Sequence, residues 1–176
     1  MTGRMKSRAR LDVAVAGGGV VGAACALALA RRDLRVALVE GREPTCWSAD
    51  APDLRVYAFA PDNAALLDAL GVWPAVRDAR AFAYRRMRVW DAAGGGELVF
   101  DADALGRAQL GWIVENNLLI DRLWAALAPA GVQVACPARV TDMEQDPSTG
   151  SGQASGVCLT LDNGTRLDAV IAIAAD

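Results

Sequence analysis

The chain has 176 residues, enough for one ordinary domain and too few for two full ones. Its hydrophobic content of 53% and mean hydropathy of +0.21 suffice for a packed core, while a net charge of −3 and a pI near 5.0 argue against a nucleic-acid-binding surface. The chain has no histidine and no C-x-x-C spacing among its four cysteines, which argues against a zinc site and a histidine-activated nucleophile. We therefore predict no metal site, no catalytic side chain, a reduced cytoplasmic location, and any chemistry supplied by a bound cofactor.

Residues 1–10 are predicted to form a basic, disordered tail, because Arg4, Lys6, Arg8 and Arg10 precede the first apolar run. A secretory signal or a membrane-spanning helix is the alternative for this stretch. Asp12 interrupts the apolar run, however, and the three consecutive glycines that follow suit neither kind of segment. We therefore favour a solvated terminus.

The next stretch predicts a strand over residues 11–16, a helix over 20–31 and a second strand over 35–39. Between the first strand and the helix lies a G-x-G-x-x-G sequence formed by Gly17, Gly19 and Gly22. In this setting the fingerprint predicts a dinucleotide-binding turn, in which the first glycine permits a tight turn and the second lets a pyrophosphate approach the backbone. The third glycine lets the helix lie close to the sheet, and the helix directs its free N–H groups at the phosphates.

Glu40 ends the second strand, 23 positions after Gly17. This is close to the spacing at which an acidic side chain accepts hydrogen bonds from an adenosine ribose. Its charge would repel a 2′-phosphate, so NADP is not expected at this turn. The stretch alone leaves both NAD and FAD open.

The middle of the chain predicts a helix that starts at Pro61 and ends near Gly71, after a segment that contains Arg55. An arginine beneath a cofactor can clamp a phosphate or carboxylate, although a surface arginine paired with a nearby acid is the alternative. Strands over 84–90 and 97–100 flank a glycine-rich turn and predict a hairpin. We expect residues 80–110 to contribute a β layer that faces the substrate.

The remaining elements complete a predicted α/β fold. Residues 111–117 lead into a helix that runs to about Ala128, with leucines at 118, 119, 123 and 127 in helical spacing. A strand over 132–136 follows, then three short strands over 140–144, 157–161 and 165–169, the first two separated by a Ser/Gly-rich loop and the last two by the hairpin turn Asp162-Asn163-Gly164. The apolar residues 170–174 are expected to form a strand in the buried middle of a parallel sheet.

Three strings carry a resemblance to a known family: the glycine fingerprint with Glu40, DLRVYA (53–58) followed by LGVW (70–73), and LGWIVEN (110–116). On these strings the chain resembles the FAD-dependent aromatic hydroxylases, most closely the branch that hydroxylates ubiquinone precursors, from residue 11 to residue 176. The resemblance implies a Rossmann-like FAD/NAD(P)-binding fold with a parallel sheet, a β-meander and part of an antiparallel substrate-domain sheet. The second string departs from the Ala-Leu-Ser that is usual in the branch, because Ala58-Phe59-Ala60 stands there.

The resemblance also implies FAD at the turn and NAD(P)H as co-substrate. By position, Gly17, Gly19 and Gly22 would hold the pyrophosphate and Glu40 the ribose, while Arg55 and Asn116 would lie near the flavin. Ala174-Ala175-Asp176 resembles the start of a second cofactor motif, in which Asp176 would help to hold FAD, and the glycine that follows it in the family and a later Gly-Asp motif are missing from the sequence. We therefore expect residues 11–176 to be an incomplete FAD-binding domain, the N-terminal part of a larger enzyme.

The resemblance implies an aromatic substrate, with or without a prenyl tail, and it leaves open a peripheral association with the inner membrane or with a biosynthetic complex. The oligomeric state stays undefined. The alternative function is a truncated, non-catalytic nucleotide-binding module that acts as a binding or assembly partner. Flavin absorbance with NAD(P)H-dependent oxygen uptake would exclude this alternative.

Overall fold

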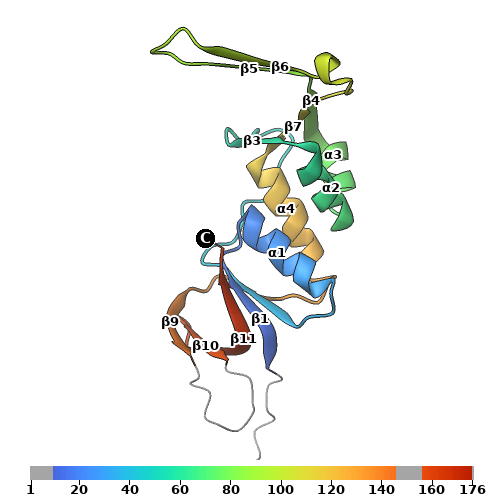
Figure 1. The fold of residues 1–176 in the computed structure, drawn as a ribbon. Coiled ribbons are helices and arrows are strands. Elements are labelled where there is room, and N and C mark those ends of the chain that lie inside the picture. The colour runs from blue at the N-terminus through green and yellow to red at the C-terminus, as the bar shows by residue number, and fades with distance from the viewer. Residues whose placement is uncertain (1–9, 146–155, 176) are drawn as a thin grey trace, which may run out of the picture. The chain divides into compact units, whose positions relative to one another are not determined.

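The computed structural model of the protein describes residues 10–145 and 156–175 (Figure 1). The chain divides into two compact units: unit 1 combines Met1–Pro44 with Leu123–Asp176, and unit 2 is the continuous stretch Thr45–Arg122. Most of the predicted basic tail, nearly all of the Ser/Gly-rich loop, and Asp176 lie outside the described residues.

Unit 1 is built on a six-stranded sheet with the order β8-β2-β1-β11-β10-β9. Four neighbouring strands run parallel: β8 (Gln133–Ala135), β2 (Val36–Val39), β1 (Leu11–Ala16) and β11 (Arg166–Ala174). Two further strands, β10 (Val157–Leu161) and β9 (Val140–Gln145), add to β11 as an antiparallel meander. The predicted combination of a Rossmann-like parallel sheet with a β-meander is therefore confirmed.

The core of unit 1 lies where β1 and β2 pack beneath α1 (Val20–Ala30). Both strands are apolar throughout their centres, as expected for parallel strands covered on both faces, and Ala14 and Val15 are fully buried. The helix buries one face made mostly of small side chains, including Ala23, Ala26 and Leu27, which lets it approach the sheet closely.

The strand β11 corrects two predictions. Residues 165–169 and 170–174 were expected as separate strands, but one strand spans Arg166–Ala174. Its first part pairs antiparallel with β10, and its second part pairs parallel with β1. The prediction of a fully buried apolar strand over 170–174 is also wrong, because Val170 is 38% exposed and Ile171 is 54% exposed.

Unit 2 contains a three-stranded antiparallel sheet, β3 (Val56–Phe59), β7 (Gly111–Glu115) and β4 (Ala81–Tyr84), in that order. Its helices are α2 (Pro61–Ala69), α3 (Trp73–Arg80), the 3-10 turn η1 (Asp103–Leu105) and the first residues of α4 (Asn116–Leu127). The predicted start of α2 at Pro61 is confirmed, whereas β3, β7 and α3 were not predicted. The leucines of α4 at 118, 119, 123 and 127 are all fully buried, which confirms their helical spacing.

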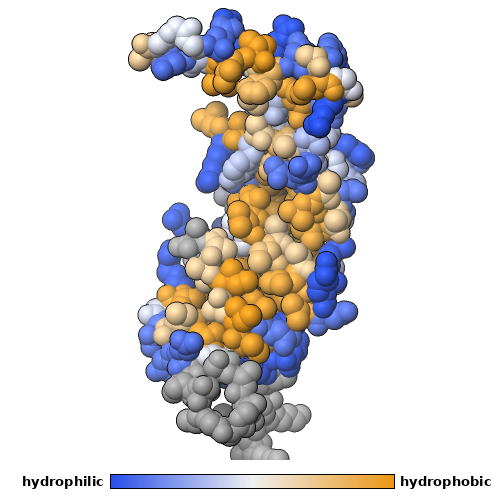
Figure 2. Space-filling view, in the orientation of Figure 1, coloured by the Kyte–Doolittle hydropathy of each residue, from blue (hydrophilic) through white to orange (hydrophobic). Residues whose placement is uncertain are grey.

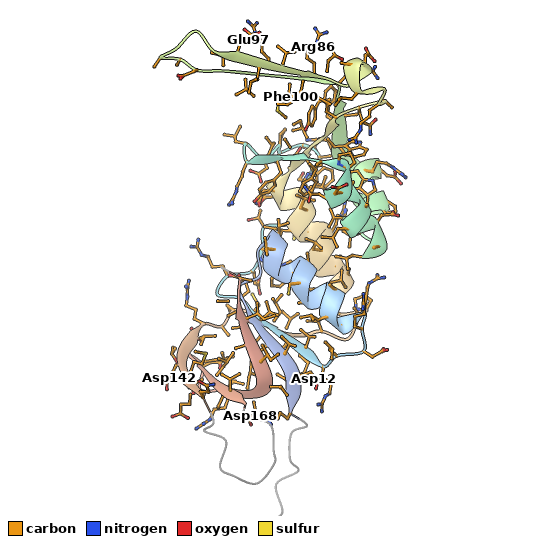
Figure 3. The ribbon with its side chains drawn as sticks, in the orientation of Figure 1. Asp12, Arg86, Glu97, Phe100, Asp142 and Asp168 are labelled. Atoms are coloured by element: carbon orange, nitrogen blue, oxygen red, sulfur yellow. The ribbon has the colours of Figure 1, made fainter. Side chains whose placement is uncertain are left out.

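The predicted hairpin is confirmed as a two-stranded sheet of β5 (Arg86–Trp90) and β6 (Glu97–Asp101). One face carries ion pairs, Arg86 with Asp101 and Arg88 with Glu97, each at 2.7 Å. The register places four apolar side chains on the other face: Met87, Val89, Leu98 and Phe100. Figure 3 shows Arg86 and Glu97 on one side of the hairpin and Phe100 on the other, and Figure 2 shows apolar and polar surface side by side there.

Candidate dinucleotide-binding site

The glycine turn begins where β1 ends, and its first residue has a conformation that favours glycine. Gly17 has φ of 109°, a region that L side chains rarely adopt. Its N–H donates to the carbonyl of Val39 at 2.9 Å, which ties the turn to the end of β2. The structure thus places Gly17 at the sharp exit from the strand, as the fingerprint predicts.

The other two fingerprint glycines face different surroundings. A Cβ built on Gly22 would lie 1.9 Å from the carbonyl oxygen of Gly17, so only glycine permits this close approach of α1 to the turn. A Cβ on Gly19 would meet no atom within 4 Å, so protein packing places no demand for glycine there. Open space at Gly19 is what a close-approaching ligand would need.

The N-terminus of α1 adds a set of backbone donors to this open space. Gly19 is the N-cap and has no side chain to cap the helix, and the first bond into the helix runs from the N–H of Ala23 to the carbonyl of Gly19 at 2.9 Å. The N–H groups of Val20, Val21 and Gly22 precede that bond and point toward the positive end of the helix dipole. Residues 17–22 therefore fit a phosphate-bearing ligand.

Glu40 lies directly beside the turn. Its Oε2 accepts the N–H of Gly18 at 2.6 Å, and its Oε1 accepts the N–H of Arg42 at 3.0 Å. These two bonds fix the carboxylate, and each oxygen retains acceptor capacity for a further donor. The predicted contact of Glu40 with a ribose stays a prediction, but the carboxylate is held where the turn begins.

Two residues of this site were missed by the sequence reasoning, Gly18 and Trp124. The indole Nε1 of Trp124, on α4, donates to the carbonyl of Gly18 at 2.8 Å. A Cβ on Gly18 would lie 2.6 Å from the Trp124 ring and 2.8 Å from the Cβ of Glu40. The only sequence signal for Gly18 was the run of three consecutive glycines, and Trp124 had no signal.

Arg55 and Asn116, the two residues predicted near the flavin, lie next to one another in unit 2. The backbone N–H of Asn116 donates to the carbonyl of Arg55 at 2.9 Å, and the side chain of Asn116 accepts the hydroxyl of Tyr57 at 3.2 Å. Asn116 is buried, whereas Arg55 is exposed, with its guanidinium 5.8 Å from the centre of the Tyr57 ring. The charge of Arg55 also contributes to the lowered pKa of Asp53, so both the cofactor contact and the alternative of an arginine paired with a nearby acid stay predictions.

Asp53 organises the backbone around Arg55. Its Oδ1 accepts the N–H of Arg55 at 2.9 Å, and its Oδ2 accepts the N–H of Asn117 at 3.0 Å, in the first turn of α4. The hydrogen bond from Arg55 is the main cause that lowers the pKa of Asp53 below its usual value of 3.8. Burial, the next largest cause, raises this pKa, and the bond from Asn117 adds to the lowering. Asp53 therefore caps α4 from a distant part of the sequence.

The predicted cofactor residue Asp176 lies outside the described residues, but its neighbour is placed. The N–H of Ala175 donates to the carbonyl of Ala16 at 2.8 Å, and the Cβ of Ala175 lies 3.2 Å from the position of a Cβ on Gly22. The end of β11 thus lies beside the glycine turn.

Comparisons with known proteins show which proteins this chain resembles. A family model described as FAD dependent oxidoreductase matches residues 12–51, which contain the turn and Glu40. The 3-demethoxyubiquinol 3-hydroxylase of Escherichia coli K12 is 42% identical over 117 residues, 66% of this chain and 30% of the relative. The mitochondrial ubiquinone biosynthesis monooxygenase COQ6 of Xenopus tropicalis is 34% identical over 174 residues, 94% of this chain and 37% of the relative.

The fold has solved counterparts as well. The crystal structure of pqsL, a probable FAD-dependent monooxygenase from Pseudomonas aeruginosa, matches with a TM-score of 0.71 at 20% identity, over 95% of this chain and 42% of that one. The predicted resemblance and the predicted cofactor class, FAD, are confirmed by these matches. The chain spans about a third of the length of the curated relatives, between 30% and 37%. In residues 10–145 and 156–175, every helix is too short or too polar to cross a membrane.

Proposed function

We propose, on the premise that this chain is a relative of the ubiquinone-biosynthesis hydroxylases with the fold of FAD-dependent monooxygenases, that it binds FAD and serves the hydroxylation of an aromatic ring. The observation that carries the proposal is the glycine turn. Gly17 adopts a positive φ, Gly22 has no room for a side chain, and Gly19 leaves the space before the N-terminus of α1 open.

In this proposal the chain's residues bind and orient the cofactor. The turn and the first N–H groups of α1 would hold the pyrophosphate, and Glu40 would accept the ribose hydroxyls while its charge disfavours a 2′-phosphate. Arg55, Asn116 and Asp176 would hold the flavin side. When bound, FAD reduced by NAD(P)H would supply the activation of oxygen that no side chain provides.

The substrate that we propose is an aromatic ring of the ubiquinone-precursor type, because two curated relatives carry names from ubiquinone biosynthesis. The hairpin of β5 and β6 would belong to a layer that faces this substrate. Its support is the row of apolar side chains on one face, of which Val89, Leu98 and Phe100 are 48%, 63% and 47% exposed. A prenylated substrate would bring the protein to the membrane surface, so peripheral association is part of the proposal.

Titration of Gly19→Val with ADP and with FAD tests the proposal. The valine side chain would fill the open space before α1, so we expect both affinities to fall by at least about tenfold, the equivalent of about 1.4 kcal/mol. Gly95→Val is the matched control, because a Cβ on Gly95 also meets no atom within 4 Å but lies in the hairpin turn.

Equal nucleotide affinity in Gly19→Val and in the unmodified chain would contradict the assigned site. Oxygen uptake with NAD(P)H then separates the two classes of function. Uptake that depends on bound flavin supports a hydroxylase, whereas nucleotide binding without uptake supports a non-catalytic binding module.

A further inference from the structure

Glu115 is a buried carboxylate at the end of β7, with 6% of its surface exposed. Three donors from two segments of unit 2 converge on its two oxygens. Oε2 accepts the indole N–H of Trp47 at 2.8 Å and the backbone N–H of Asp53 at 3.3 Å, while Oε1 accepts the guanidinium of Arg80 at 2.8 Å. Burying a carboxylate without such partners would cost on the order of several kcal/mol of folding free energy. The three donors are therefore held in place beside Glu115.

The segment from Trp47 to Arg55 has no helix or strand of its own and depends on side-chain anchors. The guanidiniums of Arg80 and Arg122 both lie over the Trp47 ring, each 5.4 Å from its centre. Arg80 also donates to the carbonyl of Ala49. Burial raises the pKa of Glu115, but the bonds from Trp47 and Arg80 outweigh this effect and hold the pKa below its usual value, so the side chain is an anion near neutral pH.

A chain of hydrogen bonds connects Glu115 to Arg55. Glu115 holds the backbone N–H of Asp53, and the carboxylate of Asp53 in turn accepts the N–H of Arg55 at 2.9 Å. The carbonyl of Arg55 accepts the N–H of Asn116, the residue that follows Glu115 in the sequence. Glu115 is thus connected to both partners of the hydrogen bond between the Asn116 N–H and the Arg55 carbonyl. It reaches Arg55 through Asp53, and it is the neighbour of Asn116 in the sequence.

We propose that Glu115 is a positioning residue for the flavin side of the cofactor, because it anchors residues 47–55 and through them places Arg55 beside Asn116. This inference rests on the proposed function. Glu115 has no part in the glycine turn, which belongs to unit 1. Loss of Glu115 should therefore affect the binding of FAD and spare the binding of ADP.

The variant Glu115→Gln tests the proposal, because glutamine has one acceptor oxygen and turns an NH2 group toward the three donors. We expect ADP affinity to stay within about twofold of the unmodified chain and FAD affinity to fall by at least about tenfold. Glu144→Gln is the matched control: Glu144 pairs with Arg166 at 3.2 Å, but both side chains are exposed. Unchanged FAD affinity would overturn the proposal, and so would equal losses for ADP and FAD, which indicate a general role in folding.

Hydrogen exchange of residues 47–55 separates a failure of this inference from a failure of the proposed function. Faster exchange in Glu115→Gln supports the anchoring role, and unchanged exchange overturns it. The milder variant Trp47→Phe removes the indole N–H bonded to Glu115, keeps a smaller aromatic ring beneath Arg80 and Arg122, and should produce the same FAD-specific loss to a smaller degree. An unmodified chain that binds neither nucleotide would reject the proposed function, and with it the flavin role of Glu115, whatever the exchange shows.

Discussion

Gly18 occupies a position that the G-x-G-x-x-G fingerprint leaves variable, yet both polar groups of this residue are bonded. Its N–H donates to Glu40 and its carbonyl accepts the indole of Trp124, and Gly18 itself is buried. The two bonds fix the backbone of Gly18 in the middle of the turn. The shape of the turn therefore depends on α4 and on Glu40 as well as on the three fingerprint glycines.

Replacement of Trp124 by Phe removes the N–H donor and keeps an aromatic ring. We expect the free energy of unfolding to fall by about 0.5–1.5 kcal/mol, the usual net value of one hydrogen bond. Urea unfolding measures the change. Trp90→Phe is the control, since Trp90 is 66% exposed on the hairpin, and an equal effect of both variants would contradict the role of Trp124.

The fingerprint residues could be placed from the sequence because their spacing reflects backbone geometry that only glycine permits. Trp124 could not, because helical spacing indicates which face of α4 is apolar but not which distant atom an indole N–H meets. Glu115 was missed for the same reason, since its three partners all lie far from it in the sequence. The local sequence pattern predicts the glycine turn, whereas the long-range hydrogen bonds that hold it could not be predicted from that pattern.

Among the helices and strands, β11 was predicted wrongly because its two halves pair with different strands. β11 changes partner at Ala169, which pairs with both β10 and β1, and its sequence changes there from alternating to continuously apolar. That change in pattern predicted two strands, although a single strand spans both parts. The helix α3 was missed because it has only eight residues and begins at Trp73-Pro74, with Trp73 and Val76 as its buried positions.

The start of α4 has a cap that responds to acid. Because the pKa of Asp53 is lower in the folded chain than its usual 3.8, its ionised form stabilises the fold above that value, and the stabilisation is lost as pH falls through the folded pKa. Asp53→Asn keeps an acceptor oxygen but cannot ionise. We expect the unmodified chain to be more stable than the variant near pH 7 and the difference to vanish in acid, as measured by urea unfolding at a series of pH values.

Asp62→Asn in the first turn of α2 is the control for this experiment. The Asp62 carboxylate accepts no hydrogen bond from another described residue, so its replacement should produce a smaller difference at pH 7. A difference between Asp53→Asn and the unmodified chain that is constant from pH 7 to acid would refute the capping role of the charge.

At the scale of the whole molecule, unit 1 is assembled from both ends of the chain, and β11 closes its sheet against β1. Ala169 is fully buried at this junction and packs with Leu11, Ala14, Ala37 and Leu159. The sequence predicted the strands and the α/β class, but the order of the strands depends on pairing between distant segments. That pairing also sets the position of Ala175 beside the turn.

Ala169→Asp places an unpaired carboxylate in this core. We expect the free energy of unfolding to fall by more than about 3 kcal/mol. ADP binding should be lost as well, because the glycine turn directly follows the end of β1. Val170→Asp is the neighbouring control, 38% exposed, and should cost about 1 kcal/mol or less. Urea unfolding and ADP titration measure both variants, and similar costs for the two would show that β11 does not close the core.

The pairing of β1 with β11 also determines when the sheet of unit 1 can form during synthesis. Residues 45–122 are one continuous stretch, so all of unit 2 has left the ribosome before β11 is translated. β1 is made before β11, and one of its two edges has no neighbour until residues 169–174 appear. The strand that leads into the glycine turn therefore lacks one of its two sheet neighbours until β11 has been synthesised, and until then its free edge is open to pairing with other segments.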